Sequence, residues 1–264
     1  MKHIDLNGGH VLVTGGAGSI GSAIAIESAQ AGAVVAVCDI DGSKAEKVAA
    51  NIQRSGGTAA GFRIDVRDQD NVSAVATKAI ERLGPLRGLV TAAGILRTGS
   101  IADMPKDQWD EVMAVNVDGT MNAVRSAIPH LEDNNGAIVT IGSVSAFIGS
   151  NDGGAYTTSK GAVLSLTYAV AGELAGRGIR VNNVAPGWVD GGFTHQALAS
   201  SNQPDQLLRR AKQLHALGRM AKPNDVANAV VWLLSDQASF VTGSMLLVLS
   251  RLEKARRLPS STSN

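Results

Sequence analysis

The stretch V-L-V-T-G-G-A-G-S-I-G at residues 11–21 constrains the fold more than any other part of the chain. Val11, Leu12 and Val13 are apolar, and such a run is typical of a strand buried on both faces. The glycines that follow predict a tight turn, and apolar residues at helical spacing from Ile20 onward predict a helix. In this context, glycines let backbone N–H groups approach a pyrophosphate, whose charge the helix N-terminus favours. We therefore expect a dinucleotide-binding loop, the alternative being a tight turn that binds nothing.

Strands and helices are expected to alternate along the rest of the chain. Apolar runs that end at turn residues predict strands at residues 33–38, 59–64, 89–92, 136–142, 178–185 and 245–249. Apolar residues at helical spacing predict helices at about residues 20–31, 41–54, 68–83, 106–131, 152–175, 204–214 and 223–234, with Asp68 as an N-cap. This alternation predicts a doubly wound (Rossmann-type) α/β fold, in which a seven-stranded parallel sheet is flanked by helices.

A single domain accounts for the length of the chain. Its 264 residues, 44% of them hydrophobic and 18% charged, suit one large α/β core, and no repeat or shift in composition marks a boundary. We expect residues 1–250 to form a dinucleotide-binding and catalytic domain. Residues 188–218 follow a strand and lose the regular pattern, which predicts a substrate lid. Residues 251–264 are basic and then rich in Ser and Thr, which predicts a mobile tail.

Charge and cysteine content argue against several functions. The net charge of +1 gives no reason to expect nucleic acid as a partner, and we expect no metal. The single cysteine, Cys38, has no partner for an internal disulfide, and its strand context predicts an inert buried thiol. The first residues lack the apolar run of a signal peptide, and no apolar run is long enough to span a bilayer. These features predict a cytoplasmic protein with a small-molecule substrate and no membrane partner.

Asp39 follows the second predicted strand, roughly 20 residues after the glycines. A carboxylate at that place can accept hydrogen bonds from the ribose of an adenosine and would repel a 2′-phosphate. No Lys or Arg lies in the glycine stretch or next to Asp39 in the sequence to hold such a phosphate. NAD is therefore expected rather than NADP, the alternative being that Asp39 is a plain strand-end acid.

Tyr156 and Lys160 lie one turn apart on a predicted helix. A phenol has a reference pKa of about 10, so it is a poor base at neutral pH. The Lys160 ammonium and a cationic nicotinamide ring together would lower the pKa of Tyr156 and let it exchange a proton with a substrate oxygen. A core tyrosine beside a lysine whose stem packs on apolar surface is the alternative.

Two further polar residues are candidates for the same site. Ser143 stands at the end of a predicted parallel strand, where ligands bind in such sheets, and its hydroxyl can hold the substrate oxygen. Asn116 falls within the apolar stripe of the helix predicted at 106–131 and must find hydrogen-bond partners there. Spacing leaves two roles open for Asn116: a catalytic amide, or an amide that ties down the backbone of a neighbouring strand.

These motifs together resemble the short-chain dehydrogenase/reductase family over about Leu6 to Leu249. Thr14-Gly15-x-x-x-Ser19-x-Gly21 is similar to the family's Thr-Gly-x-x-x-Gly-x-Gly loop, with serine in place of the middle glycine. The spacing Gly15-x-x-Gly18-x-x-Gly21 also fits the longer, epimerase-like branch. Asn116, Ser143, Tyr156 and Lys160 resemble the catalytic tetrad of the compact branch. The resemblance implies that Ser143 orients substrate, Tyr156 is the acid/base, Lys160 binds ribose and tunes Tyr156, and Asn116 positions a water.

The resemblance also implies which residues contact the cofactor. These are Gly15, Gly18, Ser19, Ile20, Gly21, Asp39, Asp65, Val66, Ala92, Ala93, Gly94, Tyr156, Lys160, Pro186, Gly187 and Val189. Three departures stand out. Thr91 and Ala92 replace two asparagines, the threonine usual after Pro186-Gly187 falls at Gly191 with Thr194 as a candidate substitute, and Leu249-Ser250-Arg251 replaces a terminal Asp-Gly-Gly.

The sequence thus predicts an NAD(H)-dependent dehydrogenase of secondary alcohols, or reductase of ketones, and the resemblance implies a homotetramer. An NADP-linked or epimerase-type enzyme is one alternative, and a protein that senses NAD without turnover is another. The expected pocket is mostly apolar and favours cyclic, aryl or aliphatic alcohols over polyols. It is expected to be lined by Leu96, Val144, Phe147, Trp188, Phe193 and His195.

Overall fold

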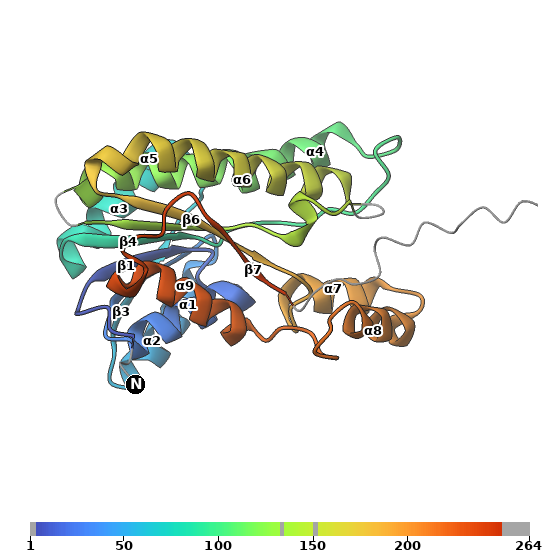
Figure 1. Ribbon diagram of the computed structural model, residues 1–264, viewed down its shortest axis with the longest axis horizontal. Coiled ribbons are helices and arrows are strands. Elements are labelled where there is room, and N and C mark those ends of the chain that lie inside the picture. The colour runs from blue at the N-terminus through green and yellow to red at the C-terminus, as the bar shows by residue number, and fades with distance from the viewer. Residues whose placement is uncertain (1–3, 133–134, 150–152, 250–264) are drawn as a thin grey trace, which may run out of the picture.

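The computed structural model describes residues 4–132, 135–149 and 153–249. Its centre is a seven-stranded sheet in the order β3-β2-β1-β4-β5-β6-β7, with every pair of neighbours parallel (Figure 1). The strands are β1 His10–Thr14, β2 Val34–Asp39, β3 Thr58–Arg63, β4 Leu86–Thr91, β5 Ala137–Ile141, β6 Arg180–Pro186 and β7 Met245–Val248. The predicted doubly wound fold is confirmed. The strand order reverses direction between β1 and β4, and ligands bind at such a switch point, beyond the carboxyl ends of the strands.

Two layers of helices cover the sheet (Figure 1). On one face lie α1 Ser19–Gln30, α2 Gly42–Arg54 and α9 Pro223–Leu234. On the other lie α3 Gln69–Leu83, α5 Gly119–Leu131 and α6 Gly154–Leu174. Because strand side chains alternate between faces, Val11 and Val13 of β1 pack in the first layer's core while Leu12 packs in the second. Burial on both faces explains why the strands are nearly continuous apolar runs in the sequence.

Acidic side chains cap two of the helices where the sequence predicted helix starts. The Asp68 carboxylate accepts hydrogen bonds from the backbone N–H groups of Asp70 and Asn71, which confirms it as the N-cap of α3. The Asp41 carboxylate accepts one from Lys44 at the start of α2. Cys38 is fully buried, and burial raises the pKa of its thiol well above the usual range, as expected for an inert core residue.

The helix predicted at 106–131 is interrupted. The structure has α4 Lys106–Met113, then the π-helical turn η1 Ala114–Asp118, then α5 Gly119–Leu131. Asn116 lies in the middle of η1 and is fully buried. Apolar residues keep helical spacing on both sides of η1, so periodicity alone did not reveal it. Single π turns within helices are frequent at functional sites.

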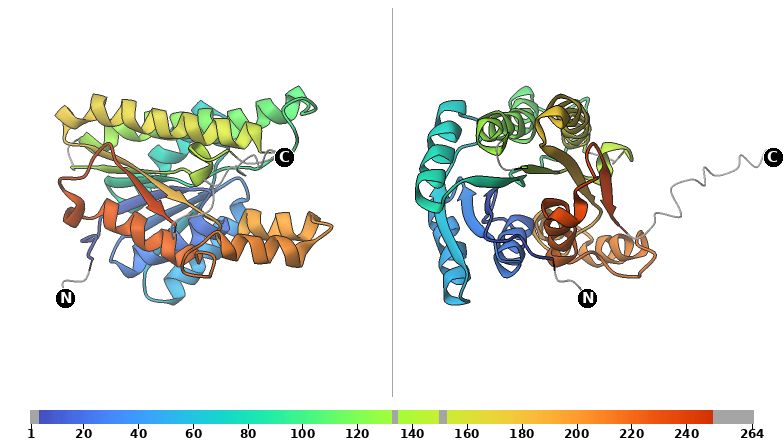
Figure 2. Two further views of the ribbon diagram at one scale, coloured as in Figure 1. Left: turned by 45° about the vertical axis from the view of Figure 1, so that its right-hand side comes forward. Right: turned by 60° about the vertical axis from the view of Figure 1, so that its left-hand side comes forward.

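Residues 188–218 are more regular than predicted. They contain α7 Gly192–Ser200, which was not predicted, and α8 Pro204–Gln213, which was. Both helices project beyond the carboxyl ends of the strands (Figure 2). The tail predicted at 251–264 lies outside the described residues.

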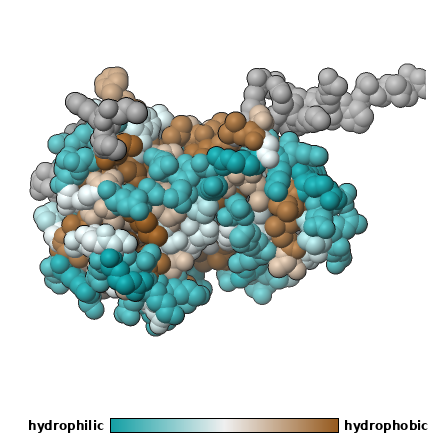
Figure 3. Space-filling view, turned by 90° about the horizontal axis from the view of Figure 1, so that it is seen from below, coloured by the Kyte–Doolittle hydropathy of each residue, from teal (hydrophilic) through white to brown (hydrophobic). Residues whose placement is uncertain are grey.

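The face that carries α1, α2 and α9 has hydrophilic side chains with hydrophobic patches between them (Figure 3). Within the described ranges, none of the helices has the length and apolar character that crossing a membrane requires.

Candidate active site

Asn116, Ser143, Tyr156 and Lys160 come from three segments that meet beside the carboxyl end of β5. Ser143 follows β5, is 8% exposed, and caps the short 3-10 turn η3 Val144–Ala146 by accepting a hydrogen bond from Ser145 N. Tyr156 and Lys160 lie on the first turns of α6, and Asn116 lies in η1. The Ser143 hydroxyl lies near enough to the Tyr156 phenol to act on its pKa as a hydrogen-bond donor. The structure therefore brings the predicted serine and tyrosine into direct contact.

The side-chain amide of Asn116 fixes the backbone of the segment that follows β4. Its Oδ1 accepts from Ile95 N (2.8 Å) and its Nδ2 donates to Ile95 O (3.0 Å), so the amide pairs with both polar groups of one residue after β4. Nδ2 also donates to Ser159 Oγ (2.9 Å), which donates to Tyr156 O (2.8 Å). Of the two roles left open by spacing, the hydrogen bonds support the one that ties down backbone. Asn116 thereby joins the segment after β4 to the first turn of α6.

Lys160 is buried beneath Tyr156. Its Nζ donates to Ile141 O (2.9 Å) at the end of β5 and lies 5.6 Å from the centroid of the Tyr156 ring. Burial lowers the pKa of Lys160 to about 8, because the ammonium has left water without gaining a carboxylate partner. Its backbone contact and its distance from the phenol ring fit a residue that positions its charge under Tyr156.

The pKa of Tyr156 shifts in the direction opposite to the sequence-based expectation. Burial raises it to about 12, and the hydrogen bond with Ser143 opposes that shift. Desolvation therefore outweighs any effect of Lys160 on the phenol in this structure. The Phe193 ring, from α7, contributes to the burial by packing edge-on against Tyr156 with centroids 6.0 Å apart.

The glycine stretch at residues 14–21, which we call the cradle, is packed so closely against neighbouring backbone that larger residues would not fit at Gly15 or Gly21. A β-carbon at Gly15 would lie 2.5 Å from Ala93 N, and one at Gly21 would clash with Gly15 O. Gly18 is the N-cap of α1 and has no side chain, so it offers no capping acceptor to the first N–H groups of α1. Free N–H groups and a helix N-terminus at the β1–β4 switch point fit the pyrophosphate of a dinucleotide.

Close contacts connect this cradle to Asn116 and Lys160. The Gly15 backbone packs on Ala92 and Ala93, which follow β4. At the next residue, a β-carbon on Gly94 would lie 3.3 Å from Asn116 Oδ1 and 3.6 Å from Lys160 Nζ. The small residues Ala92, Ala93 and Gly94 therefore let the loop, the segment after β4, Asn116 and Lys160 pack against one another.

Asp39 anchors the glycine loop. Its carboxylate accepts from Ala17 N (3.0 Å) and Asp41 N (3.1 Å). Arg63 lies directly opposite Asp39, at the paired position on β3. Sequence reasoning found no cation next to Asp39 and missed Arg63, because parallel pairing brings together residues far apart in the chain.

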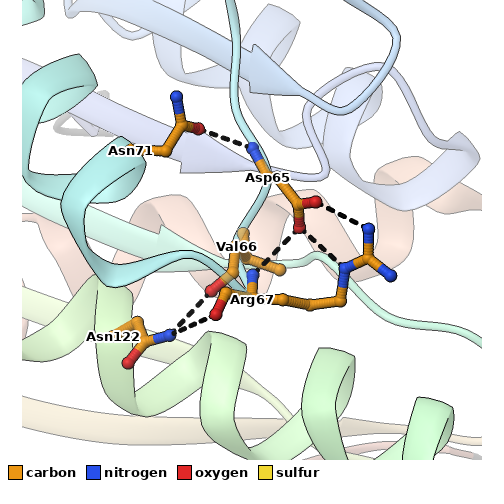
Figure 4. A network of polar contacts seen from close by, with 5 residues as sticks. All are labelled: Asp65, Val66, Arg67, Asn71 and Asn122. Atoms are coloured by element: carbon orange, nitrogen blue, oxygen red, sulfur yellow. Dashed lines mark hydrogen bonds and ion pairs between the residues drawn. The ribbon is translucent and has the colours of Figure 1, made fainter.

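Asp65, which the family resemblance places among the cofactor contacts, has both carboxylate oxygens engaged (Figure 4). Arg67 Nε donates to Oδ1 (2.9 Å) and Arg67 Nη2 to Oδ2 (2.6 Å), and this contact holds the pKa of Asp65 below its usual range. Asn71 accepts from Asp65 N, and Asn122 donates to the carbonyl of Val66. The backbone of Asp65 and Val66 is thus fixed from two helices, α3 and α5.

The chain after β6 is fixed by backbone contacts and by close packing against a buried histidine. Gly187 N donates to Val248 O, and Val189 forms an isolated bridge with Ala221. A β-carbon at Gly187 would lie 2.7 Å from the ring of His215, a 3%-exposed residue that sequence reasoning missed because it lies in the irregular stretch. Burial and the nearby positive charge of Arg219 lower the pKa of His215.

Of the predicted pocket residues, Phe193 lies at the site, whereas His195 and Phe147 are largely exposed. Phe193 packs on Tyr156, as expected of a lining residue. His195 instead points to Asp190 (Nε2 to Oδ1, 2.9 Å) with 62% of its side chain exposed, and Phe147 is 48% exposed. A shallow pocket of about 300 Å³ lies nearby, lined by Ile101, Met104, Lys106 and Trp109. Ile101 packs on Gly154, two residues before Tyr156, so this stretch borders the site although its sequence gave no sign of it.

Known proteins match nearly the whole chain. The family model described as Enoyl-(Acyl carrier protein) reductase matches residues 15–249. A 2-(S)-hydroxypropyl-CoM dehydrogenase 3 from Xanthobacter autotrophicus is 42% identical over 90% of this chain and 94% of its own. An "inactive 2-(S)-hydroxypropyl-CoM dehydrogenase 2" from the same organism is 42% identical over 83% of this chain and 94% of its own.

A solved structure agrees with these matches. The crystal structure of a dehydrogenase/reductase from Sinorhizobium meliloti superposes with a TM-score of 0.85 at 36% identity, covering 92% of this chain and 94% of that one. The glycine cradle, the Ser143–Tyr156 contact and these matches agree with one another. The chain belongs to the short-chain dehydrogenase/reductase family of oxidoreductases.

Proposed function

We propose that this protein is an NAD(H)-dependent enzyme that interconverts a secondary alcohol and a ketone. The observation that carries the proposal is the contact between Ser143 and Tyr156 directly above buried Lys160, with the glycine cradle joined to it through Gly94. A family member that only bound the dinucleotide would need the cradle. It would not need a half-buried phenol, a nearby serine hydroxyl and a buried lysine at one place.

Each residue has one task in the proposed reaction. Ser143 donates a hydrogen bond to the substrate oxygen and orients it toward Tyr156. Tyr156 accepts the hydroxyl proton during oxidation and returns one to the carbonyl during reduction. Lys160 provides the positive charge that a phenolate needs, and Asn116 keeps η1, Ile95 and α6 in register. A bound NAD supplies the hydride acceptor and a positive ring that adds to the charge of Lys160.

Two relatives show why this assignment rests on geometry. Each is 42% identical in sequence to this chain, yet one is named a dehydrogenase and the other is named an inactive dehydrogenase. Overall identity therefore does not distinguish an enzyme from a protein without turnover. The arrangement of Ser143, Tyr156 and Lys160 supports turnover here.

The substrate side favours an apolar molecule. Phe193 packs edge-on against the Tyr156 ring, and three of the four residues that line the neighbouring pocket are apolar, namely Ile101, Met104 and Trp109 beside Lys106. A cyclic, aryl or aliphatic secondary alcohol suits such surfaces better than a polyol, whose hydroxyl groups would lose hydrogen bonds to water. Residues 188–218, which carry Phe193, would then serve as the substrate lid.

Cofactor choice is expected to depend on Asp39. Ribose hydroxyls donating to this carboxylate favour NAD, and the 2′-phosphate of NADP would be repelled. We expect kcat/KM with NAD to exceed that with NADP by about a hundredfold or more. Asp39→Ala should reduce this ratio mainly by impairing NAD, and adding Ile40→Arg at the exposed neighbouring position should begin to admit NADP.

Controls separate charge from loop anchoring. Asp39→Asn keeps an acceptor for Ala17 N and removes the charge, so it should lower the preference while the loop stays in place. Arg63 favours the competing NADP-linked assignment, since it is a cation opposite Asp39; Arg63→Ala should impair NADP more than NAD. Equal efficiency with both cofactors in the unmodified protein would refute the role given to Asp39.

Assembly as a homotetramer, built partly on the helices that carry Asn116 and Tyr156, stays a prediction from family resemblance. Light scattering of the purified protein measures it directly.

A further inference from the structure

Two places where the sequence departs from the family pattern meet in space. Ser19 replaces the middle glycine of the loop, and Gly191 stands where a threonine is usual after Pro186-Gly187. A β-carbon at Gly191 would clash with Ser19 Oγ and lie 3.2 Å from Ser19 Cβ. The serine side chain thus occupies the space that a side chain at residue 191 would need.

This contact joins two functional segments. Ser19 is the first residue of α1, at the cradle, and Gly191 directly precedes α7, which carries Phe193 onto Tyr156. Gly191 has φ +156° and Gly192 has φ +47°, so both residues adopt backbone conformations that disfavour a side chain. Within the described residues, no hydrogen bond engages Ser19 Oγ, so the hydroxyl can donate or accept a hydrogen bond where the glycine loop meets residues 188–218.

We propose that Ser19 and Gly191 form a coupled pair that seats the base of the lid on the cofactor loop. The side chain at residue 19 replaces the one missing at residue 191, and each residue is tolerated because of the other. The pair positions both the cradle and Phe193, so its disruption alters dinucleotide binding as well as packing. The effect on dinucleotide binding rests on the proposed function; the packing between the two residues does not.

A matched set of glycine variants tests the pair. Gly191→Ala and Gly192→Ala both place a β-carbon on positive-φ backbone, but at Gly192 it would lie an ordinary 3.5 Å from Ser19 Cβ. Each is made in the natural chain and with Ser19→Gly. Thermal unfolding without cofactor reports the packing, and the dissociation constant for NADH, from fluorescence titration, reports the cradle.

Coupling is expected for only one glycine. Gly191→Ala should lower Tm by about 3–6 °C and weaken NADH binding about tenfold. Adding Ser19→Gly should recover at least about half of both losses, incompletely because φ at residue 191 still disfavours a side chain. The Gly192→Ala losses should not change with Ser19→Gly.

Two results would overturn the coupling. One is additivity, in which Ser19→Gly leaves the loss of Tm caused by Gly191→Ala unchanged. The other is a recovery of Tm by Ser19→Gly in the Gly192→Ala variant that is as large as its recovery in the Gly191→Ala variant. If the natural chain bound no NADH, the proposed function would fail, while the unfolding measurements would still decide whether Ser19 and Gly191 are coupled.

Discussion

Replacing Tyr156 by phenylalanine is expected to lower kcat by about a thousandfold or more, with NADH binding changed by less than about threefold. The substitution removes only the hydroxyl that we propose exchanges a proton with the substrate and that interacts with Ser143. The ring stays, so its edge contact with Phe193 and its place above Lys160 are kept. Steady-state kinetics and fluorescence titration of NADH measure the two quantities separately.

The chain supplies a matched control for this variant. Tyr168 is the only other tyrosine of the sequence, lies on the same helix α6 and is 46% exposed. Tyr168→Phe should leave kcat within about twofold, since surface substitutions away from the site rarely matter. Near-normal kcat in Tyr156→Phe would mean that another group moves the proton.

Replacing Lys160 by alanine is expected to lower kcat/KM by about a hundredfold or more and to move the pH–rate profile toward higher pH. The sign follows from the site. Tyr156 acts as a base only as phenolate, and burial already raises its pKa to about 12. A positive charge near the ring favours the phenolate, so removing Lys160 raises that pKa further, and activity then rises only at higher pH.

Two more lysine variants separate charge from packing. Lys160→Met fills the same space without charge and should behave like Lys160→Ala. Lys160→Arg keeps a charge that does not titrate in the working range, and should move the profile less than Lys160→Met. In the natural chain, the contribution of Lys160 should fade as pH rises past its pKa of about 8. An unmoved profile in Lys160→Met would show that this residue does not tune Tyr156.

The architecture was predictable because local signals and the global fold agree. Strands buried on both faces appear as continuous apolar runs, and Asp68 marks a helix start through its own side-chain geometry. The position of Ser143, directly after β5, is likewise tied to a strand that the sequence defines. Family motifs then assigned roles to these residues.

Features that depend on contacts across the sheet were not predictable. Arg63 meets Asp39 through strand pairing, and Ser19 meets Gly191 through the turn after β6. The π turn η1 leaves apolar periodicity intact, so only its backbone hydrogen bonds reveal it. The pKa of Tyr156 was expected to fall because opposite charge is visible in the sequence, whereas burial, which dominates, is a property of the folded site.

The most direct test of the proposed reaction is the formation of reduced nicotinamide, followed by absorbance, with a panel of cyclic, aryl and aliphatic secondary alcohols. The panel is run with NAD and NADP, in the natural chain and in Tyr156→Phe. We predict NADH formation by the natural chain with at least one alcohol of the panel, much less with NADP, and near-complete loss in Tyr156→Phe. No reduction of either cofactor with any alcohol, or undiminished turnover in Tyr156→Phe, would contradict the assignment of Ser143, Tyr156 and Lys160 to alcohol oxidation.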